Sequence, residues 1–400
     1  MKCDPTIVKL KDLCIGGKGK YGIPASAVPY SKNLYTYLRI TDITNEGRIN
    51  KSGLVSVDDE KASEYLLQPN DIVFARTGGS TGRNYFYDGT DGELVYAGFL
   101  IKFSIDPYCV NPKYVKYYCQ SKQYRDWVNS FNTGSTRGNI NAQTYANMEL
   151  PVPCRKQQDL LVDTLSALDD KIELNNKINE NLERQAQSIY HERFETINKD
   201  ELPVGWRVVA LGDVAVISKK SFNPSKEPEI MLEHYSIPAF DESHFPVFEL
   251  STAIKSNKFV VDKKCFMISK LNPTTKRVWK PYCLTKNTVC STEFIVYKAK
   301  DSTITDFLYS AIDSISFSDF MCSHVTGSTG SRQRTTPSDT LSFEFVLPSE
   351  NELNSFQALV SPMYAQMRIN SIENDKLKQL RDSLLPKLMS GDIDIAKIDT

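Results

Sequence analysis

The chain has 400 residues, with 48 Lys plus Arg, 49 Asp plus Glu and a formal net charge of −1. Phosphate neutralisation supplies most of the affinity of an isolated DNA-binding domain, so this near-neutral balance excludes a binder that works by its own positive charge alone. No apolar run approaches the roughly 18 residues of a membrane span, and no basic region followed by an apolar core opens the chain, so we expect a cytoplasmic protein with no membrane partner.

Residues 1–150 alternate short apolar runs with turn residues. The runs at 71–76 and 95–103 are bounded by Pro, Asn, Asp and Gly, which predicts strands separated by turns. Pro112 is suited to the first turn of a helix, which we expect to extend to about Phe131. Leu150–Pro151–Val152–Pro153 is expected to end this domain, because two prolines resist both a helix and a strand ladder.

The stretch from Leu160 to Arg193 contains no Pro or Gly, and its apolar residues follow coiled-coil spacing at steps of four and three. Two asparagines occupy positions within this seam. Such a helix needs a partner helix, since its apolar stripe would otherwise face water. The predicted first seam comprises Leu161, Leu165, Leu168, Ile172, Asn175, Asn179, Leu182, Ala186 and Ile189.

The partner helix lies in the same chain. Adding 195 to each residue number of the first seam gives a second seam with asparagines at the same two positions. Polar residues in a coiled-coil core cost stability but select one register, so their recurrence indicates duplication rather than two unrelated amphipathic helices. The predicted second seam comprises Phe356, Val360, Met363, Met367, Asn370, Asn374, Leu377, Arg381 and Leu384.

A second globular segment begins at Leu202–Pro203–Val204–Gly205–Trp206 and repeats the pattern of the first. The offset is 194 for two strands, and at an offset of 193 Thr326–Gly327–Ser328–Thr329 is identical to Thr133–Gly134–Ser135–Thr136. The repeated elements are a strand at 265–268, a strand at 289–297, a helix from about Thr305 to Cys322, and Leu347–Pro348 before the second long helix.

These patterns predict an α+β chain with an approximate twofold internal repeat. Two mixed α/β domains, residues 1–154 and 200–348, alternate with two long helices, residues 155–199 and 349–400, which should pair antiparallel as an intramolecular coiled coil. The first seam covers 29 residues, roughly 43 Å at 1.5 Å per residue. One turn of B-DNA is about 34 to 36 Å, so a spacer of this length suits a bipartite DNA site.

The globular segments are slightly basic and the long helices are acidic. Lys plus Arg exceed Asp plus Glu by three in residues 1–150 and by one in 201–345, whereas acidic residues exceed basic ones by three in 151–200 and by two in 346–400. Because the globular segments are only slightly basic, we expect partners to supply much of the grip on DNA.

Two Gly/Ser/Thr-rich loops with basic residues recur in each half and are the candidates for DNA contact. Glycine lets the backbone approach a phosphate, hydroxyls bond phosphate oxygens, and Arg can grip guanine with two hydrogen bonds. A merely solvated loop is the alternative. The candidates are Arg76, Thr77, Ser80, Arg83, Ser135, Thr136, Arg137 and Asn139 in the first half, and Lys270, Lys276, Arg277, Ser328, Thr329, Arg332 and Arg334 in the second.

Catalytic and metal signatures are poor. The nine cysteines form no Cys-x-x-Cys pair and have no His at ligand spacing, so we expect no metal site. Gly78–Gly79–Ser80–Thr81–Gly82 lacks the following Lys-Ser/Thr of a nucleotide-binding loop. The sequence therefore predicts no catalytic residue and no cofactor in this chain.

Three motifs, in order, cover nearly the whole chain. They are Leu150–Pro151–Val152–Pro153 with Gln157–Gln158, Leu202 to Trp206 with Leu211–Gly212–Asp213–Val214, and the tail from Leu384 to Ile393. In these motifs and their order the chain resembles the specificity subunit of Type I restriction-modification systems. It departs at Cys154 and Arg155, where the family often has a further Pro or small residue, and at Ser349, which follows Pro348 in place of a second Pro.

The resemblance implies two target recognition domains, each reading one half of an asymmetric double-stranded DNA site. The long helices would set the gap and dock two modification subunits, which use S-adenosylmethionine to methylate adenine. Restriction subunits would add translocation and cleavage that depend on ATP and Mg²⁺. Two alternatives stay open: a coiled-coil adaptor that binds protein rather than DNA, and the recognition part of a single-chain restriction enzyme. Inserting four residues near Asn176 is expected to lengthen the DNA spacer or abolish recognition.

Overall fold

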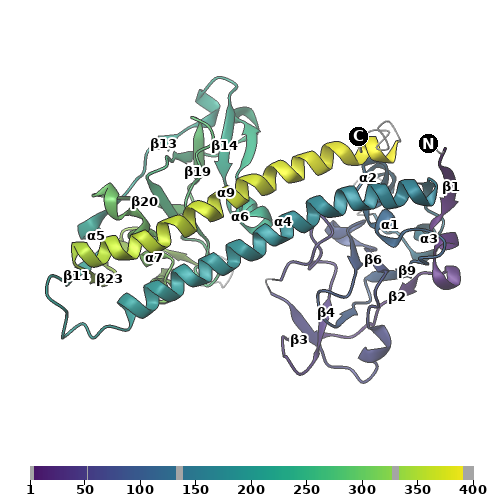
Figure 1. Ribbon diagram of the computed structural model, residues 1–400, viewed down its shortest axis with the longest axis horizontal. Coiled ribbons are helices and arrows are strands. Elements are labelled where there is room, and N and C mark those ends of the chain that lie inside the picture. Colours follow the sequence, from purple (N-terminus) through teal and green to yellow (C-terminus); the bar gives the residue numbers. More distant parts are fainter. Residues whose placement is uncertain (1–3, 52, 132–137, 327–332, 391–400) are drawn as a thin grey trace. The chain divides into compact units, whose positions relative to one another are not determined.

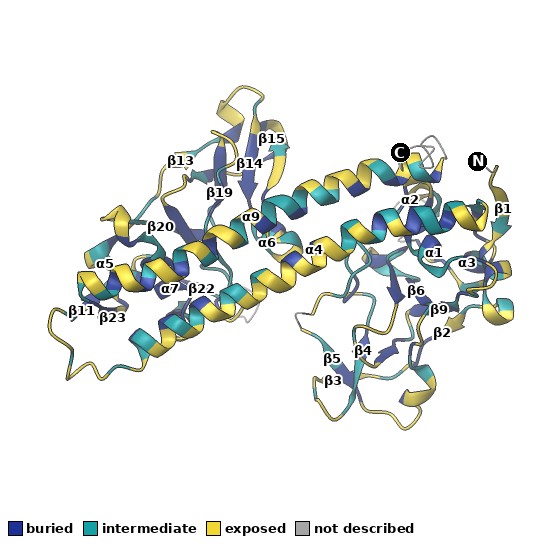
Figure 2. Cartoon of the chain, viewed as in Figure 1, coloured by how far each residue is buried: buried dark blue, intermediate teal, exposed yellow. Residues whose placement is uncertain are grey.

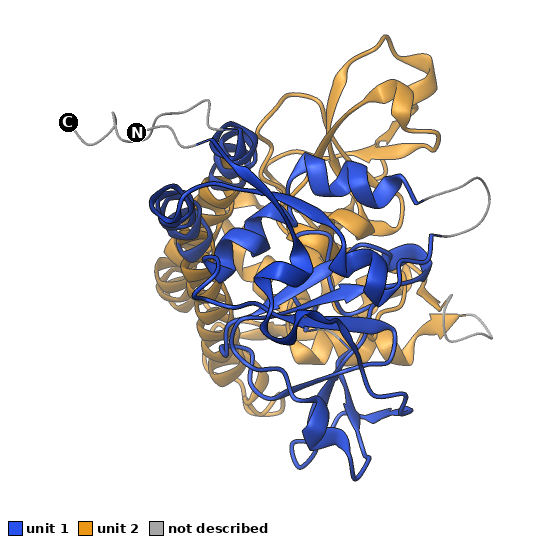
Figure 3. Cartoon of the chain, turned by 90° about the vertical axis from the view of Figure 1, so that its right-hand side faces the viewer, with its two compact units in different colours: residues 1–170, 377–400 blue, residues 171–376 orange. Residues whose placement is uncertain are grey.

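The computed structural model describes residues 4–51, 53–131, 138–326 and 333–390. The chain forms two compact units, which Figure 3 colours separately: unit 1 comprises residues 1–170 and 377–400, and unit 2 comprises residues 171–376. Two long helices, α4 (Arg155–Tyr190) and α9 (Glu350–Met389), each contribute residues to both units (Figure 1).

Among the described residues, unit 1 holds three sheets with strand orders β1-β10, β2-β9-β6-β7 and β3-β5-β4-β8. Its strands are β1 (Thr6–Lys9), β2 (Lys20–Tyr21), β3 (Ala27–Pro29), β4 (Tyr35–Leu38), β5 (Val55–Val57), β6 (Asp71–Ala75), β7 (Asn84–Tyr87), β8 (Leu94–Tyr96), β9 (Leu100–Ser104) and β10 (Glu149–Val152). Its short helices are α1 (Pro112–Tyr118), α2 (Lys122–Asn129) and α3 (Ala142–Ala146).

Unit 2 holds sheets of orders β11-β23, β12-β20-β17-β18, β13-β16-β19-β14-β15 and β21-β22. Its strands are β11 (Arg207–Ala210), β12 (Ala215–Ile217), β13 (Ser221–Phe222), β14 (Met231–Tyr235), β15 (Val247–Leu250), β16 (Lys258–Val260), β17 (Cys265–Ser269), β18 (Val278–Trp279), β19 (Thr288–Ser291), β20 (Phe294–Ala299), β21 (Val325–Thr326), β22 (Arg334–Thr335) and β23 (Glu344–Leu347). Its short helices are α5 (Leu211–Val214), α6 (Ile237–Ser243), α7 (Thr305–Ile312) and α8 (Ile315–Ser323).

The same topology occurs in both units. The order β2-β9-β6-β7 matches β12-β20-β17-β18. In the other large sheet of each unit, β5-β4-β8 matches β15-β14-β19, and the pairs β4–β8 and β14–β19 are both parallel. In unit 2 the strand β16 also pairs with β19, where unit 1 has the isolated bridge between Leu66 and Val95. The internal repeat and the α+β class predicted from the sequence are therefore present in the fold.

The sequence predicted one helix where each unit has two. The expected helix from Pro112 to about Phe131 is divided into α1 and α2, and the one from about Thr305 to Cys322 into α7 and α8. A serine caps each second helix: Ser121 accepts a hydrogen bond from the backbone of Tyr124, and Ser314 from that of Phe317. Serine favours the N-cap position over a helix interior, which explains both breaks.

The two longer strand predictions were wrong in the same way. The run at 95–103 is divided into β8 and β9 by a turn in which the Leu100 amide donates to the Ala97 carbonyl oxygen, 2.8 Å away. The run at 289–297 is divided into β19 and β20. Both turns lie beside the candidate loops.

The Pro-rich segment after Leu150 also differs from the prediction. It does not resist a ladder, because β10 pairs antiparallel with β1 and places Pro151 opposite Ile7. Proline is tolerated here since this two-stranded sheet consists only of edge strands.

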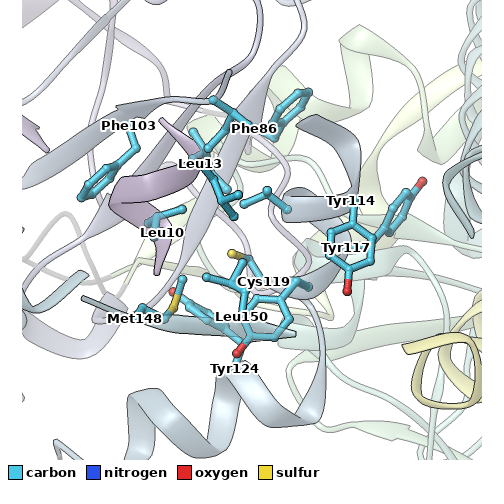
Figure 4. Packing of buried hydrophobic residues seen from close by; sticks show 14 of the residues in the cluster. Leu10, Leu13, Phe86, Phe103, Tyr114, Tyr117, Cys119, Tyr124, Met148 and Leu150 are labelled. Carbon is cyan, nitrogen blue, oxygen red and sulfur yellow. The ribbon is translucent and has the colours of Figure 1, made fainter. Parts of the chain in front are cut away.

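Each unit has its own apolar core. In unit 1 the core lies between the sheet of β6 and β9, helices α1 and α2, and the adjoining parts of α4 and α9. Figure 4 shows part of this core, around β9, α1 and α2. In unit 2 an aromatic group that includes Tyr190, Phe194, Phe307 and Phe356 joins the long helices to α7. Buried and exposed positions alternate along both long helices (Figure 2), as an amphipathic helix requires.

Within each unit the segments of α4 and α9 pair antiparallel. In unit 2 the Asn175 amide donates to Asn374 (2.9 Å) and the Asn370 amide donates to Asn179 (2.8 Å). Because the two helices run in opposite directions, the first asparagine of each seam faces the second asparagine of the other seam. The structure thus satisfies the buried amides against one another.

The remaining seam residues vary in burial. Leu161, Leu165, Ile172 and Val360 are buried, and Leu168, Leu182, Met363, Met367, Leu377 and Leu384 are half-buried. Leu385 is more deeply buried than Leu384, and packs into the unit 1 core.

A charge cluster around Asp169 joins the parts of unit 1. The Asp169 carboxylate lies 3.0 Å from Arg381 of α9, accepts a hydrogen bond from Tyr117 at 3.0 Å, and lies 3.8 Å from both Lys116 and Arg48. Arg381 occupies a predicted seam position and is buried. Its charge is tolerated there because Asp169 is opposite and Asp382 is adjacent.

Glu183 gives unit 2 an expected pH dependence. Burial, and next the charge of Asp313, raise the pKa of Glu183 from 4.5 to about 7, with Lys276 opposing. Because this folded-state pKa exceeds the unfolded value, the folded protein holds the proton longer, and stability should fall as pH rises from about 4.5 to 7. Glu183→Gln should flatten this decline and make unit 2 more stable above pH 7.

Thermal melts across that pH range test this expectation, with the exposed Glu229→Gln as the control. A decline that is as steep in Glu183→Gln as in the unmodified chain would contradict it.

Candidate nucleic-acid interface

Two of the predicted loops of unit 1 converge. The loop after β6 and the segment from Gly138 to Asn141 are joined by two hydrogen bonds: Thr81 Oγ1 donates to the Gly138 carbonyl oxygen (2.9 Å), and the Ile140 amide donates to that of Arg76 (2.9 Å). The Arg76 amide in turn donates to the Phe99 carbonyl oxygen (3.1 Å) in the β8–β9 turn. Three loops distant in sequence therefore form one surface.

Arg76 is held by an aromatic neighbour. Its guanidinium carbon lies 5.1 Å from the centre of the Tyr21 ring, which favours a cation–π contact. Its Nε atom is buried and has no hydrogen-bond partner among the described residues. The Tyr21 hydroxyl accepts a hydrogen bond from the Ala142 amide (3.2 Å), which ties the ring to the neighbouring segment.

The other candidates of unit 1 differ in exposure. Thr77 is half-buried where the loop begins, and Asn139 is exposed. Ser80 is buried, with 8% of its surface exposed, so it is poorly placed for a phosphate. Arg83 donates to the Ile43 carbonyl oxygen (2.9 Å), a contact that holds the loop to unit 1.

Unit 2 builds the same frame at equivalent positions. The Lys270 amide donates to the Glu293 carbonyl oxygen (2.9 Å), as Arg76 does to Phe99, and the Thr335 amide donates to the Lys270 carbonyl oxygen (3.1 Å), as Ile140 does to Arg76. The backbone arrangement is thus repeated while the side chains are exchanged. We call this set of hydrogen bonds the loop frame.

The charged candidates of unit 2 have separate partners. Arg334 forms a two-bond ion pair with Glu293, with Nε–Oε2 of 3.0 Å and Nη2–Oε1 of 3.1 Å. Arg277 pairs instead with Asp241 of α6. The structure therefore brings Lys270 and Arg334 together and directs Arg277 elsewhere.

Lys276 is also directed away from the loop frame. Its amine lies 2.8 Å from a carboxylate oxygen of Asp313, which is almost fully buried and accepts a hydrogen bond from Gln187 of α4 (2.6 Å). Burial raises the pKa of Asp313, and the Lys276 charge opposes this. Lys276 consequently attaches this loop to the long helix.

Six predicted contacts lie outside the described residues: Ser135, Thr136, Arg137, Ser328, Thr329 and Arg332. Sequence reasoning missed Tyr21, Phe99 and Glu293. Phe99 falls inside an apolar run that was assigned to one strand, yet 58% of its surface is exposed. Gly98, immediately before it, was the available signal for a turn.

The described part of the chain lacks two kinds of feature. No cluster of three or more His, Cys, Asp or Glu residues there is arranged to hold a metal ion. None of the helices there combines the length and apolar character that crossing a membrane demands.

Residues 4–184 match the family model of the Type I restriction modification DNA specificity domain. The chain is 25% identical over 312 residues to the MjaIX specificity subunit of Methanocaldococcus jannaschii, covering 72% of this chain and 70% of that one. It is 21% identical over 408 residues to the HindI specificity subunit of Haemophilus influenzae, covering 82% and 87%.

Among solved structures, the fold is similar to the S subunit of the Type I restriction-modification system of M. genitalium. The TM-score is 0.56 at 16% identity, over 96% of each chain. The matched relatives, the matched domain and the repeated fold agree. In sequence and fold the chain is therefore similar to the DNA specificity subunits of Type I restriction-modification systems.

Proposed function

We propose that this chain selects a bipartite, asymmetric DNA site, with each unit reading one half through its loop frame. The observation that carries the proposal is the repetition of the frame with different side chains: Tyr21, Arg76 and Phe99 in unit 1, and Lys270, Glu293 and Arg334 in unit 2. Equal backbone frames can approach DNA in the same way, while unequal side chains select different base edges.

The long helices set the spacing in this proposal, because each contributes residues to both units. They also dock two modification subunits, which bind S-adenosylmethionine and methylate adenine at N6. Restriction subunits, using ATP and Mg²⁺, supply translocation and cleavage. The chain itself catalyses nothing and works beside the chromosome in the cytoplasm. The small excess of basic charge in its globular segments supports a division of labour in which partners provide much of the phosphate contact.

The test is to co-express the chain with the modification subunit from its own genome and to map methylated adenines by single-molecule sequencing. We expect one bipartite motif with an unspecified gap. Replacing residues 1–154 by those of another specificity subunit should change one half of the motif only. Because the exchanged segment ends at residue 154, it contains both β1 and β10, and the pairing of these two strands is kept.

A stably assembled complex that adds no methylation would sink the proposal and favour the coiled-coil adaptor. A motif that changes in both halves after the exchange would contradict the assignment of one half to each unit.

A further inference from the structure

The β8–β9 turn of unit 1 and the β19–β20 turn of unit 2 occupy equivalent places in the two loop frames. Each supplies a carbonyl oxygen to a basic residue of the candidate loop, from Phe99 to Arg76 and from Glu293 to Lys270. The side chains of these two turn residues differ: Phe99 is apolar and Glu293 is acidic. A position with a constant backbone role and a changed side chain is where two readers of different sequences are expected to differ.

We propose that Phe99 and the Glu293–Arg334 pair are specificity-determining residues, an inference that rests on the proposed function. Phe99 makes an apolar contact with a thymine methyl in the half-site of unit 1. Arg334 donates two hydrogen bonds to a guanine in the half-site of unit 2, and Glu293 is the positioning residue that orients it.

Phe99 fits this role through its exposure and its neighbours. A ring with 58% of its surface exposed gains little from folding, so stability of the unit does not explain its presence. The Arg76 backbone amide is hydrogen-bonded to the Phe99 carbonyl oxygen, so the Arg76 cation lies at the same surface. The Tyr21 ring contacts that cation. An apolar group beside a cation suits the thymine methyl, which projects into the major groove near phosphates.

Arg334 fits through the geometry of its ion pair. Glu293 engages Nε and one hydrogen of Nη2, so the outer edge of the guanidinium, formed by Nη1 and Nη2, keeps the paired donors that match guanine O6 and N7. Its side chain is 42% exposed, against 29% for Glu293. A carboxylate held at the inner edge fixes the guanidinium plane before DNA arrives, which lowers the entropy lost on contact.

A docking surface for a protein partner could also use an exposed aromatic ring. The loop frame favours DNA because the exposed groups of both units come with Arg or Lys at the same backbone position. The two ideas differ in outcome: loss of a base reader changes the preferred sequence, and loss of a docking contact weakens methylation at all sites equally.

The experiment uses the complex of the full chain with its modification subunits, with variants Phe99→Ala, Phe99→Leu, Arg334→Lys and Glu293→Gln. The methylated motif is mapped for each, and thermal melts check folding. Tyr108→Ala removes an aromatic ring that is 95% exposed in unit 1 and outside the frame. Arg193→Lys alters an Arg–Glu pair of similar exposure in unit 2. These two variants are the matched controls.

One half of the DNA motif is expected to change when residues 1–154 are exchanged. In that half, we expect Phe99→Ala to lower the preference for one T·A pair by about tenfold. Phe99→Leu should retain that preference. In the other half, Arg334→Lys should relax one G·C position by about tenfold, and Glu293→Gln should relax the same position less. The controls should leave both halves unchanged.

The inference is overturned if the motif keeps every base preference in the variants, or if methylation falls equally at all sites. The complex without substitutions gives a further test. If the half of its DNA motif assigned to unit 1 contains no thymine, the role of Phe99 is overturned. If the half assigned to unit 2 contains no guanine, the role of Arg334 is overturned. Failure of the proposed function is distinct, since the unmodified complex would then show no bipartite motif at all.

Discussion

Lengthening both long helices by one heptad is expected to widen the gap in the DNA site by about three base pairs. The change duplicates Thr164–Asp170 after Asp170 in α4, and Leu377–Ser383 before Leu377 in α9, at the borders of the two units. Seven residues add about 10.5 Å at 1.5 Å per residue, and one base pair occupies about 3.4 Å.

The paired insertion keeps the seam because a heptad returns each residue to nearly the same helix face. It also duplicates Asp169 and Arg381 together, so the added turns carry their own ion pair, while the Asn175–Asn374 and Asn179–Asn370 pairs stay in register. The gap is read from the methylated motif of the complex with its modification subunits.

The control inserts four residues near Asn176 in α4 alone, the insertion that the sequence already suggested. This shifts one helix against the other, separates the asparagine pairs and should abolish recognition. If the paired insertion left the original gap in the motif, the helices would not be setting the spacing.

Removing the charge of Asp169 should destabilise unit 1 by about 2 to 4 kcal/mol, because a buried cation then loses its main partner. Asp169→Asn leaves Arg381 with Asp382 alone, and leaves Lys116 and Arg48 beside it with no opposite charge from α4. Tyr117 also loses a carboxylate acceptor. Urea-dependent hydrogen exchange, read on peptides of α1, reports the opening free energy of unit 1 apart from that of unit 2.

Two further variants sharpen this test. Asp170→Asn changes the adjacent, exposed carboxylate and should leave the opening free energy nearly unchanged. The double variant Asp169→Leu with Arg381→Leu replaces the pair by apolar residues and should recover much of the loss. A double variant as unstable as Asp169→Asn would mean that packing, and not the unpaired charge, explains the effect.

The sequence predicted the elements whose signal is periodic. The seams, their asparagines, the strands near 71–76 and 265–268 and the repeat of the two globular segments follow from spacing along one chain. It failed at Phe99 and Glu293, because an apolar run with one glycine looks the same whether it passes straight through or turns. The DNA-contact residues stay predictions, and six of them lie outside the described residues.

By itself, the sequence determined that the chain is duplicated and that each long helix needs a helical partner, since hydrophobic periodicity and polar seam positions are properties of local order. Only the tertiary structure decided which side chains meet. Arg381 is a charged residue at an apolar seam position, and only its ion pair with Asp169 of the other helix accounts for it. Phe99 and Arg76 form one surface only after β6, β8 and β9 fold together. Such contacts join residues far apart along the chain, and no spacing rule encodes them.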